Sequence, residues 1–199
     1  MTNKTYTPGQ IVTLAGIEFV VLDDLGEACD GSRLLFLLAL KSQGQSTFGD
    51  TNNYAESNLR DAVDVWLAQL GKKIDREYVL PRIIDLTTLD GYNGFGSLKV
   101  DAAPLTLDEA QKYAEVMPDP DEACWLATGW GGPEHFGSVY ALLVGSDGGW
   151  SNGYCSGLDG IRPALVISSL LLSSEDESDL SEYSTDELLA EVRRRMEGN

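Results

Sequence analysis

The stretch GSDGGWSNGYCSGLDGIRPALVI, residues 145–167, joins two kinds of sequence. Residues 145–159 are rich in Gly and small polar side chains, which favour turns and loops. Residues 161–167 form a run with strand propensity, and Pro163 suits a strand start or a bulge. Three further residues are expected to bury against the N-terminal strands: Ala164, Val166 and Ile167. The stretch therefore predicts a displayed loop with little regular structure, anchored by a strand that brings the two ends of the domain together.

Strands are predicted on both sides of a helical middle section. Residues 10–25 and 32–42 read as strands separated by a turn, and the unbroken apolar run LLFLLAL, residues 34–40, predicts a strand buried on both faces. Strand patterns return in three later stretches, separated by Gly-rich loops: 124–128, 138–144 and 160–167.

Two amphipathic helices are predicted between these strands. Residues 57–71 begin with Ser57 as a cap and end at Gly71, and the apolar side is formed by Leu59, Val63, Trp66, Leu67 and Leu70. A second helix is expected over 106–117, where Thr106 and Glu109 have the spacing of a capping box. Strands, two helices and then strands again make an α+β fold rather than a doubly wound α/β fold.

The domain boundary is expected near Ser173. Residues 1–172 form one domain, residues 173–183 an acidic Ser-rich linker, and residues 184–199 a C-terminal amphipathic helix with a basic last turn. Two roles are open for that helix: packing back on its own domain, or docking and self-association that would make a homo-oligomer or attach the protein to a virion.

The charge of the chain limits its partners. Its 199 residues carry 14 Lys and Arg against 32 Asp and Glu, a formal net charge of −18. A protein with this negative charge repels the phosphate backbone of nucleic acids, so nucleic-acid binding is not expected. The longest apolar run is too short to span a bilayer, and the N-terminus lacks the pattern of a signal peptide. We expect synthesis in the cytoplasm, with a final location on a virion or cell surface left open.

Four motifs resemble a known fold family. They are a Ser-x-Leu-Arg…Trp-Leu helix (Ser57, Leu59, Arg60, Trp66, Leu67), a helix start (Leu105, Thr106, Glu109, Ala110), a strand matched in part (Trp125, Leu126, Thr128) and the ending Gly160 to Ala164. Together they resemble a bacterial and phage branch of the C-type-lectin-like fold, over roughly residues 10–168. The resemblance implies two helices, antiparallel sheets and paired domain termini.

This branch is similar to the variable proteins of diversity-generating retroelements and, distantly, to formylglycine-generating enzymes. In the variable proteins, hypervariable loops before the closing strand bind the ligand. The resemblance implies such a face here, on a non-enzymatic protein that recognises a protein or glycan on a cell surface or particle. Exposed-type aromatics among small polar residues suit this role. The candidate binding residues are Thr128, Trp130, Glu134, His135, Phe136, Tyr140, Asp147, Trp150, Asn152, Tyr154, Ser156 and Asp159. The alternative is a virion structural or decoration protein.

Catalysis and bound cofactors are not expected. The resemblance implies that an oxidative enzyme of the formylglycine-generating type would need a close pair of cysteines near the end of the fold. This chain has only Cys155 there, so the resemblance is weakest at the catalytic position. A Cys124–Cys155 bridge and buried free thiols both stay open. His135 is the single histidine, which excludes a multi-histidine metal site. Calcium is the one ion left open, with oxygen ligands from Asp147, Asn152 and Asp159.

Overall fold

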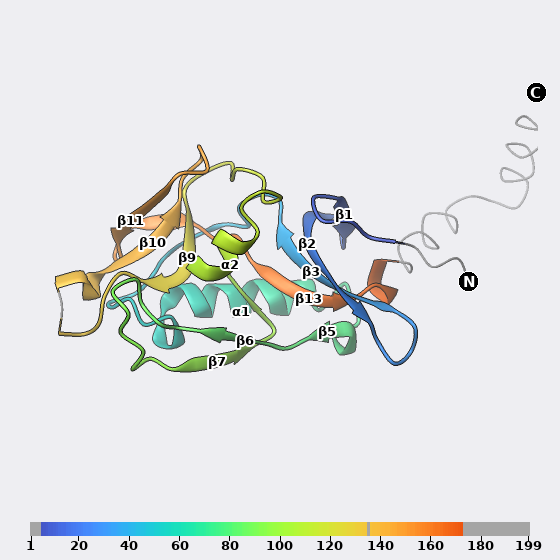
Figure 1. Cartoon of the computed structure of the whole chain (residues 1–199), viewed down its shortest axis with the longest axis horizontal. Coiled ribbons are helices and arrows are strands. Elements are labelled where there is room, and N and C mark those ends of the chain that lie inside the picture. The colour runs from blue at the N-terminus through green and yellow to red at the C-terminus, as the bar shows by residue number, and fades with distance from the viewer. Residues whose placement is uncertain (1–4, 135, 173–199) are drawn as a thin grey trace, which may run out of the picture.

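A computed structural model describes residues 5–134 and 136–172 (Figure 1). A six-stranded sheet has the order β1 (Ile11–Leu14), β2 (Ile17–Glu27), β3 (Arg33–Ala39), β13 (Ala164–Ser168) and β5 (Val79–Leu80), and β8 (Ala102–Ala103) also pairs with β13. The strand β13 runs antiparallel to β3, with Ala164 opposite Leu38 and Ser168 opposite Leu34. The predicted pairing of the closing strand with the N-terminal strands is confirmed.

The second sheet lies at the other end of the molecule (Figure 1). It has the order β11 (Trp150–Tyr154), β10 (Tyr140–Val144), β9 (Cys124–Gly129), β12 (Leu158–Gly160) and β4 (Gln45–Thr47). Its pairings are antiparallel except that of β12 with β9. A separate antiparallel pair is formed by β6 (Arg82–Asp85) and β7 (Ser97–Val100).

The helices and short 3-10 turns lie between these strands in the sequence. They are η1 (Tyr54–Glu56), α1 (Asn58–Leu70), η2 (Arg76–Tyr78), α2 (Leu107–Lys112) and η3 (Phe136–Val139). The first predicted helix is confirmed: the Ser57 hydroxyl accepts a hydrogen bond from the Arg60 backbone N–H at 3.0 Å, and Gly71 follows the last turn. Its apolar side is buried, although Trp66 is only partly covered.

The second helix is shorter than the prediction of 106–117. The capping box between Thr106 and Glu109 is present, but the helix ends at Lys112. Tyr113 leaves the helical conformation, and its ring packs against Phe36 with the ring centroids 5.6 Å apart. Its hydroxyl donates a hydrogen bond to Asp23 at 2.9 Å. These tertiary contacts stop the helix after six residues, although its sequence continues the helical pattern.

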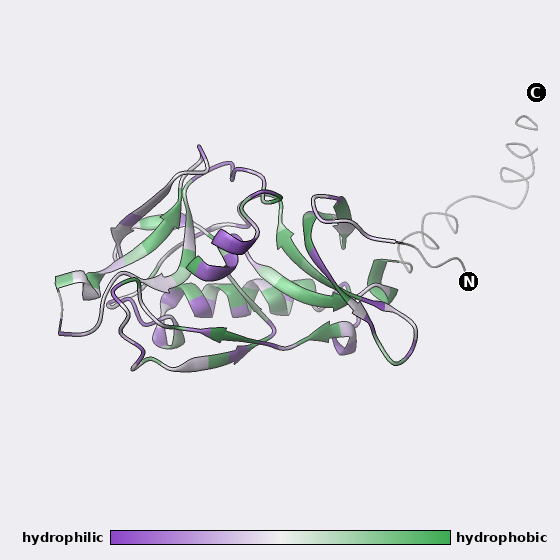
Figure 2. Cartoon of the chain, in the orientation of Figure 1, coloured by the Kyte–Doolittle hydropathy of each residue, from purple (hydrophilic) through white to green (hydrophobic). Residues whose placement is uncertain are grey.

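Two hydrophobic clusters cover the two faces of the central strands. On β3, Leu35 and Leu37 belong to the cluster beneath α1, whereas Phe36 and Leu38 belong to the cluster beneath α2. Figure 2 shows the corresponding hydrophobic colouring along β2, β3 and β13. The prediction that residues 34–40 form a strand covered on both faces is confirmed for the core of that run, Leu35 to Ala39.

Three details of the strand predictions are wrong. Residues 10–25 form two strands, because Ala15 and Gly16 adopt positive φ angles of 54° and 80° in a turn between them. Residues 145–159 contain β11 and most of β12, so they are not a loop without regular structure. Residues 160–167 are not one strand, since β12 ends at Gly160 and β13 begins at Ala164. The predicted linker 173–183 and helix 184–199 lie outside the described residues.

Within residues 5–134 and 136–172, no helix combines the length and apolar character required to span a membrane.

Candidate ligand-binding groove

The β10–β11 hairpin arranges aromatic side chains on one face of the second sheet. Its register places Tyr140 opposite Tyr154, Leu142 opposite Asn152 and Val144 opposite Trp150. Because side chains alternate between the faces of a strand, these six residues share one face. Leu142 and Val144 are buried in the cluster beneath α2, so the exposed part of this face lies on β11 and at Tyr140. On the other face, Ala141 and Leu143 belong to the main core, whereas Ser151 is exposed. The edge strand β11 carries the row Trp150, Asn152 and Tyr154, with a period of two residues.

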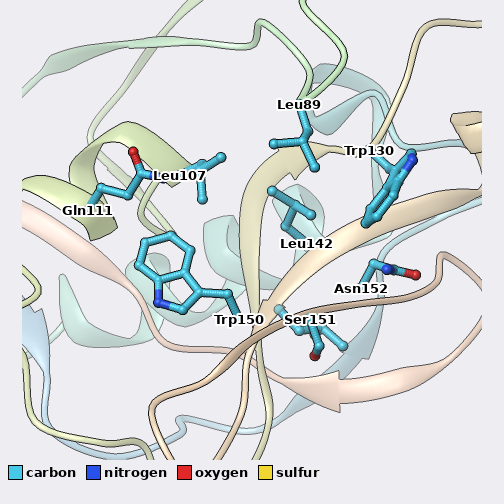
Figure 3. Close-up of a pocket in the computed structure, with 9 residues that line it drawn as sticks. Leu89, Leu107, Gln111, Trp130, Leu142, Trp150, Ser151 and Asn152 are labelled. Atoms are coloured by element: carbon cyan, nitrogen blue, oxygen red, sulfur yellow. The ribbon is translucent and has the colours of Figure 1, made fainter.

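A groove of about 370 Å³ lies along this face (Figure 3). Figure 3 shows Trp130 and Trp150 on opposite sides of it, with Leu142 and Leu89 between them and Leu107 and Gln111 beside Trp150. The two indoles are 39% and 42% exposed, so they are available to a ligand while remaining partly supported. The groove is lined by Leu89, Leu107, Gln111, Trp130, Leu142, Leu143, Trp150, Ser151 and Asn152, none of which is charged.

The backbone around Trp130 is fixed by the neighbouring loop. The Trp130 N–H donates to the Tyr140 carbonyl at 2.9 Å, and its own carbonyl accepts from the Asp90 N–H at 3.2 Å. One residue earlier, the Gly129 carbonyl accepts from the Leu89 N–H at 3.0 Å. The Asp90 carboxylate accepts from the Gly132 N–H at 3.1 Å. These bonds hold one side of the groove in place before any ligand binds, which lowers the entropic cost of binding.

Asn52 holds the same loop from inside the protein. Its side chain is buried, and its Nδ2 group lies within hydrogen-bond distance of three carbonyls, those of Gly131 at 2.8 Å and of Gly137 and Tyr140 at 3.1 Å. Its backbone N–H donates to the Ser138 carbonyl at 3.0 Å. Asn52 is therefore a positioning residue for the loop that carries Trp130. No local sequence pattern predicts this role, because the contacts join positions roughly 80 residues apart.

A row of stacked rings extends the aromatic surface beyond the groove. The ring centroids of Phe136 and Tyr140 lie 5.6 Å apart, and those of Tyr140 and Tyr154 lie 4.4 Å apart. A hydrogen bond with Tyr154 raises the pKa of the Tyr140 hydroxyl. Phe136 is 86% exposed and Tyr154 is 60% exposed. An apolar surface of this kind, adjacent to a groove, is typical of an interaction site.

A second cavity of about 250 Å³ shares Leu89 and Leu107 with the groove, so we call it the adjoining pocket. Its lining is polar, with the carboxylates of Asp85 and Asp108 and several threonines. The Thr87 hydroxyl and backbone N–H donate to Asp85 at 2.7 and 2.8 Å. These bonds hold the pKa of the Asp85 carboxyl below its usual value. The adjoining pocket is therefore negatively charged at neutral pH.

Six of the twelve predicted binding residues lie in the groove or in the adjacent aromatic row. Trp130, Trp150 and Asn152 line the groove, and Phe136, Tyr140 and Tyr154 form the adjacent row. Glu134, Asp147 and Ser156 are exposed, and Asp147 accepts from the Gly149 N–H in the β10–β11 turn. Asp159 is half-buried on β12, where burial and then Glu122 raise the pKa of its carboxyl. His135 lies outside the described residues.

Thr128 differs from the other candidates in being buried. Its hydroxyl accepts a hydrogen bond from the Leu107 N–H at 2.9 Å. This bond joins the start of α2 to β9, so the hydroxyl is engaged in holding the fold. Three groove residues from other segments were not predicted: Leu89, Leu107 and Gln111. One sequence signal could have indicated the shared face of the β10–β11 hairpin. It is the alternation, with a period of two, of Tyr140, Leu142 and Val144 and of Trp150, Asn152 and Tyr154.

All three cysteines are free, so the structure contains no Cys124–Cys155 bridge. Cys124 and Cys155 are buried and Cys29 is exposed. Burial raises the pKa of both buried thiols to about 12. A thiol with such a pKa is a weak nucleophile at neutral pH, because the thiolate is the reactive form.

Arg162 anchors the segment between β12 and β13. Its Nε donates to the Ala39 carbonyl at 2.8 Å and its Nη1 to the Pro118 carbonyl at 2.9 Å. The guanidinium therefore joins this segment to β3 and to the loop that contains Pro118. Burial lowers the pKa of the guanidinium.

The three oxygen donors considered for calcium come from different parts of the second sheet. Asp147 lies in the β10–β11 turn and Asn152 on β11, whereas Asp159 lies on β12, beyond β9. Over the part of the chain that the structure describes, no group of three or more His, Cys, Asp or Glu side chains could hold a metal ion.

Comparisons with known proteins return no family, no curated protein and no solved structure that matches this chain.

Proposed function

We propose that this protein is a non-catalytic binding protein that recognises a protein or glycan through the aromatic groove. The observation that carries the proposal is the pair of half-exposed indoles, Trp130 and Trp150, on opposite sides of a groove with uncharged walls. Exposed aromatics are costly to leave in water, and tryptophan and tyrosine dominate the energetics of many binding interfaces. The lining contains no acid, base or thiol for proton transfer or covalent catalysis.

We also propose that the fold is C-type-lectin-like and that the protein resembles retroelement variable proteins in function. Support comes from the pairing of β13 with β3, the two helices and the position of the aromatic face on the strands that precede the closing segment. In this proposal, natural variation concentrates on outward positions such as Trp150, Asn152 and Tyr154. Gly153 stays fixed, because a Cβ atom there would lie 2.9 Å from Leu143 and 3.2 Å from Trp125.

The proposal is tested by binding screens with the full-length protein. A displayed random-peptide library and a glycan array are each probed with the wild type and with a Trp130→Ala/Trp150→Ala variant. Truncation of two central aromatics is expected to weaken binding by about 30-fold or more. The thermal unfolding midpoint should be nearly unchanged, because both side chains are half-exposed. Binders that the variant retains, or the absence of any binder, would contradict the proposal.

A further inference from the structure

The segments that build the groove and the adjoining pocket contain no cationic side chain. Residues 83–98, 100–111 and 113–161 hold neither Lys nor Arg. Of these, residues 113–161 alone contain seven acids: Glu115, Asp119, Asp121, Glu122, Glu134, Asp147 and Asp159. Because the whole chain already carries a net charge of −18, this end of the molecule produces a negative field that attracts cations and repels anions.

Four cations flank these segments: Arg82, Lys99, Lys112 and Arg162. Lys99 is exposed on β7, and Arg162 binds the Ala39 and Pro118 carbonyls. The Arg82 guanidinium forms an ion pair with Glu109. The Lys112 ammonium lies 3.4 Å from Asp23 and donates to the Tyr113 hydroxyl at 2.6 Å. None of these four residues lines the groove or the adjoining pocket.

The two carboxylates of the adjoining pocket lie apart from the cations of the described residues. Among residues 5–134 and 136–172, neither Asp85 nor Asp108 forms an ion pair. The pocket that they line opens beside the groove, since Leu89 and Leu107 line both cavities. A ligand that covers the two indoles can therefore extend past Leu89 and Leu107 into the adjoining pocket. There it can place a positive group next to the carboxylates of Asp85 and Asp108.

The extent of the apolar surface indicates a protein ligand. The row of Phe136, Tyr140 and Tyr154 lies on the same side of the β10–β11 hairpin as Trp150, outside the groove itself. A small molecule held in the groove would leave this row exposed to water. A protein segment can cover the groove and the row together, and protein interfaces are enriched in Trp, Tyr and Arg.

We propose that the groove and the adjoining pocket bind a segment of a partner protein in which a Lys or Arg side chain stands beside an apolar or aromatic one. The apolar side chain packs between Trp130 and Trp150, and the cation reaches Asp85 and Asp108. Cations also bind favourably to the faces of indole rings, so a Lys or Arg that contacts Trp130 or Trp150 gains from both sources. This inference rests on the proposed binding function and adds the chemistry of the partner.

The test begins with the peptides that the full-length protein selects from the random library. They should be enriched in Lys or Arg next to aromatic or aliphatic residues. Calorimetric titration with one selected peptide should show affinity that falls by about fivefold or more between 50 and 300 mM NaCl, because salt screens exposed charges.

Charge-neutral variants locate the cation. Asp85→Asn and Asp108→Asn keep the size of each side chain, and each is expected to weaken binding by roughly two- to fivefold, the range of exposed ion pairs. Glu18→Gln removes one charge from an exposed position on β2 in the other sheet and serves as the matched control. It should change the affinity by less than about twofold, because a distant exposed charge is screened.

The outcomes separate this inference from the proposed function. If selected peptides lack cations, ignore salt or bind Asp85→Asn/Asp108→Asn as tightly as wild type, the inference is wrong. If only neutral glycans bind and the Trp130→Ala/Trp150→Ala variant loses them, the inference fails while the binding function stands. If binding of any probe survives in that tryptophan variant, the binding function itself fails. A synthetic peptide of residues 184–199 that outcompetes the library peptides would make the chain's own tail the occupant and would overturn the proposal of a partner protein.

Discussion

The strands β11 and β13 lie close together in the sequence, within residues 150–168, and have opposite environments. β13 lies inside the six-stranded sheet, pairs on both sides and is buried at all five residues. β11 lies at the edge of the five-stranded sheet, and four of its five residues are exposed. Apolar side chains are buried in the core along β13, whereas Trp150 and Tyr154 on β11 are exposed to solvent. Matched residues in the two environments make this difference measurable.

Leucine truncation should give a large contrast in stability between the two sheets. Leu165 on β13 is fully buried, so Leu165→Ala is expected to lower the free energy of unfolding by about 2–5 kcal/mol. Leu158 on β12 is 63% exposed, and Leu158→Ala should change the free energy of unfolding by less than about 0.5 kcal/mol. Denaturant unfolding of both variants measures the difference. Similar losses for the two would mean that the second sheet depends on its exposed apolar residues for folding.

An asparagine pair tests how the groove is held. Asn52→Ala removes the donor shared by the carbonyls of the Trp130 loop and is expected to cost about 1–3 kcal/mol. The same variant should weaken ligand binding because Trp130 loses its fixed position. Asn152→Ala, at an exposed position on β11, is the control and should leave unfolding nearly unchanged. Unchanged stability and affinity in Asn52→Ala would show that Asn52 does not position the Trp130 loop.

The reactivity of the three cysteines differs between the surface and the core. Under native conditions at pH 8, iodoacetamide should add one group, on the exposed Cys29, and three groups after denaturation, as read by mass spectrometry. With pKa values of about 12, Cys124 and Cys155 have only about one thiolate in ten thousand at that pH. Rapid native labelling of either buried thiol would show that the core opens readily or that the thiol is activated.

The same thiols give a pH effect of known sign. Burial raises their pKa from about 9 in the unfolded chain to about 12 in the fold, so the native state holds these protons more tightly. Stability is therefore unaffected below about pH 9 and decreases as the pH rises from 9 toward 12. In a Cys124→Ala/Cys155→Ala variant this alkaline decrease should be smaller, as measured by unfolding midpoints across the range. An equal decrease in the variant would assign it to other groups.

The fold could be predicted further than the site. The double-sided burial of β3, the helix capped by Ser57 and the anchoring by β13 follow from local patterns that the sequence displays directly. The early end of α2 could not be predicted, because it depends on the contact of Tyr113 with Phe36.

The groove residues Trp130 and Trp150 were predicted from their residue type, but the residues that line the rest of the groove were not. Leu89, Leu107 and Gln111 come from two distant segments, and only tertiary packing brings them to the β10–β11 hairpin. Thr128 was selected by its place in the same stretch, yet its hydroxyl is buried in a bond to α2. Position along the chain identifies a face poorly where strands alternate between the core and the solvent.

Two tryptophans of the second sheet test the central claim that the hairpin face serves recognition rather than folding. Trp125 on β9 is 1% exposed, and its indole N–H donates to the Ser46 carbonyl at 2.9 Å. Trp150 on β11 is 42% exposed. The measurement is the free energy of unfolding of Trp125→Ala and Trp150→Ala by denaturant titration. We predict a loss of about 3–5 kcal/mol for Trp125→Ala and less than about 1 kcal/mol for Trp150→Ala. A loss for Trp150→Ala as large as that for Trp125→Ala would make Trp150 a core residue and contradict the account.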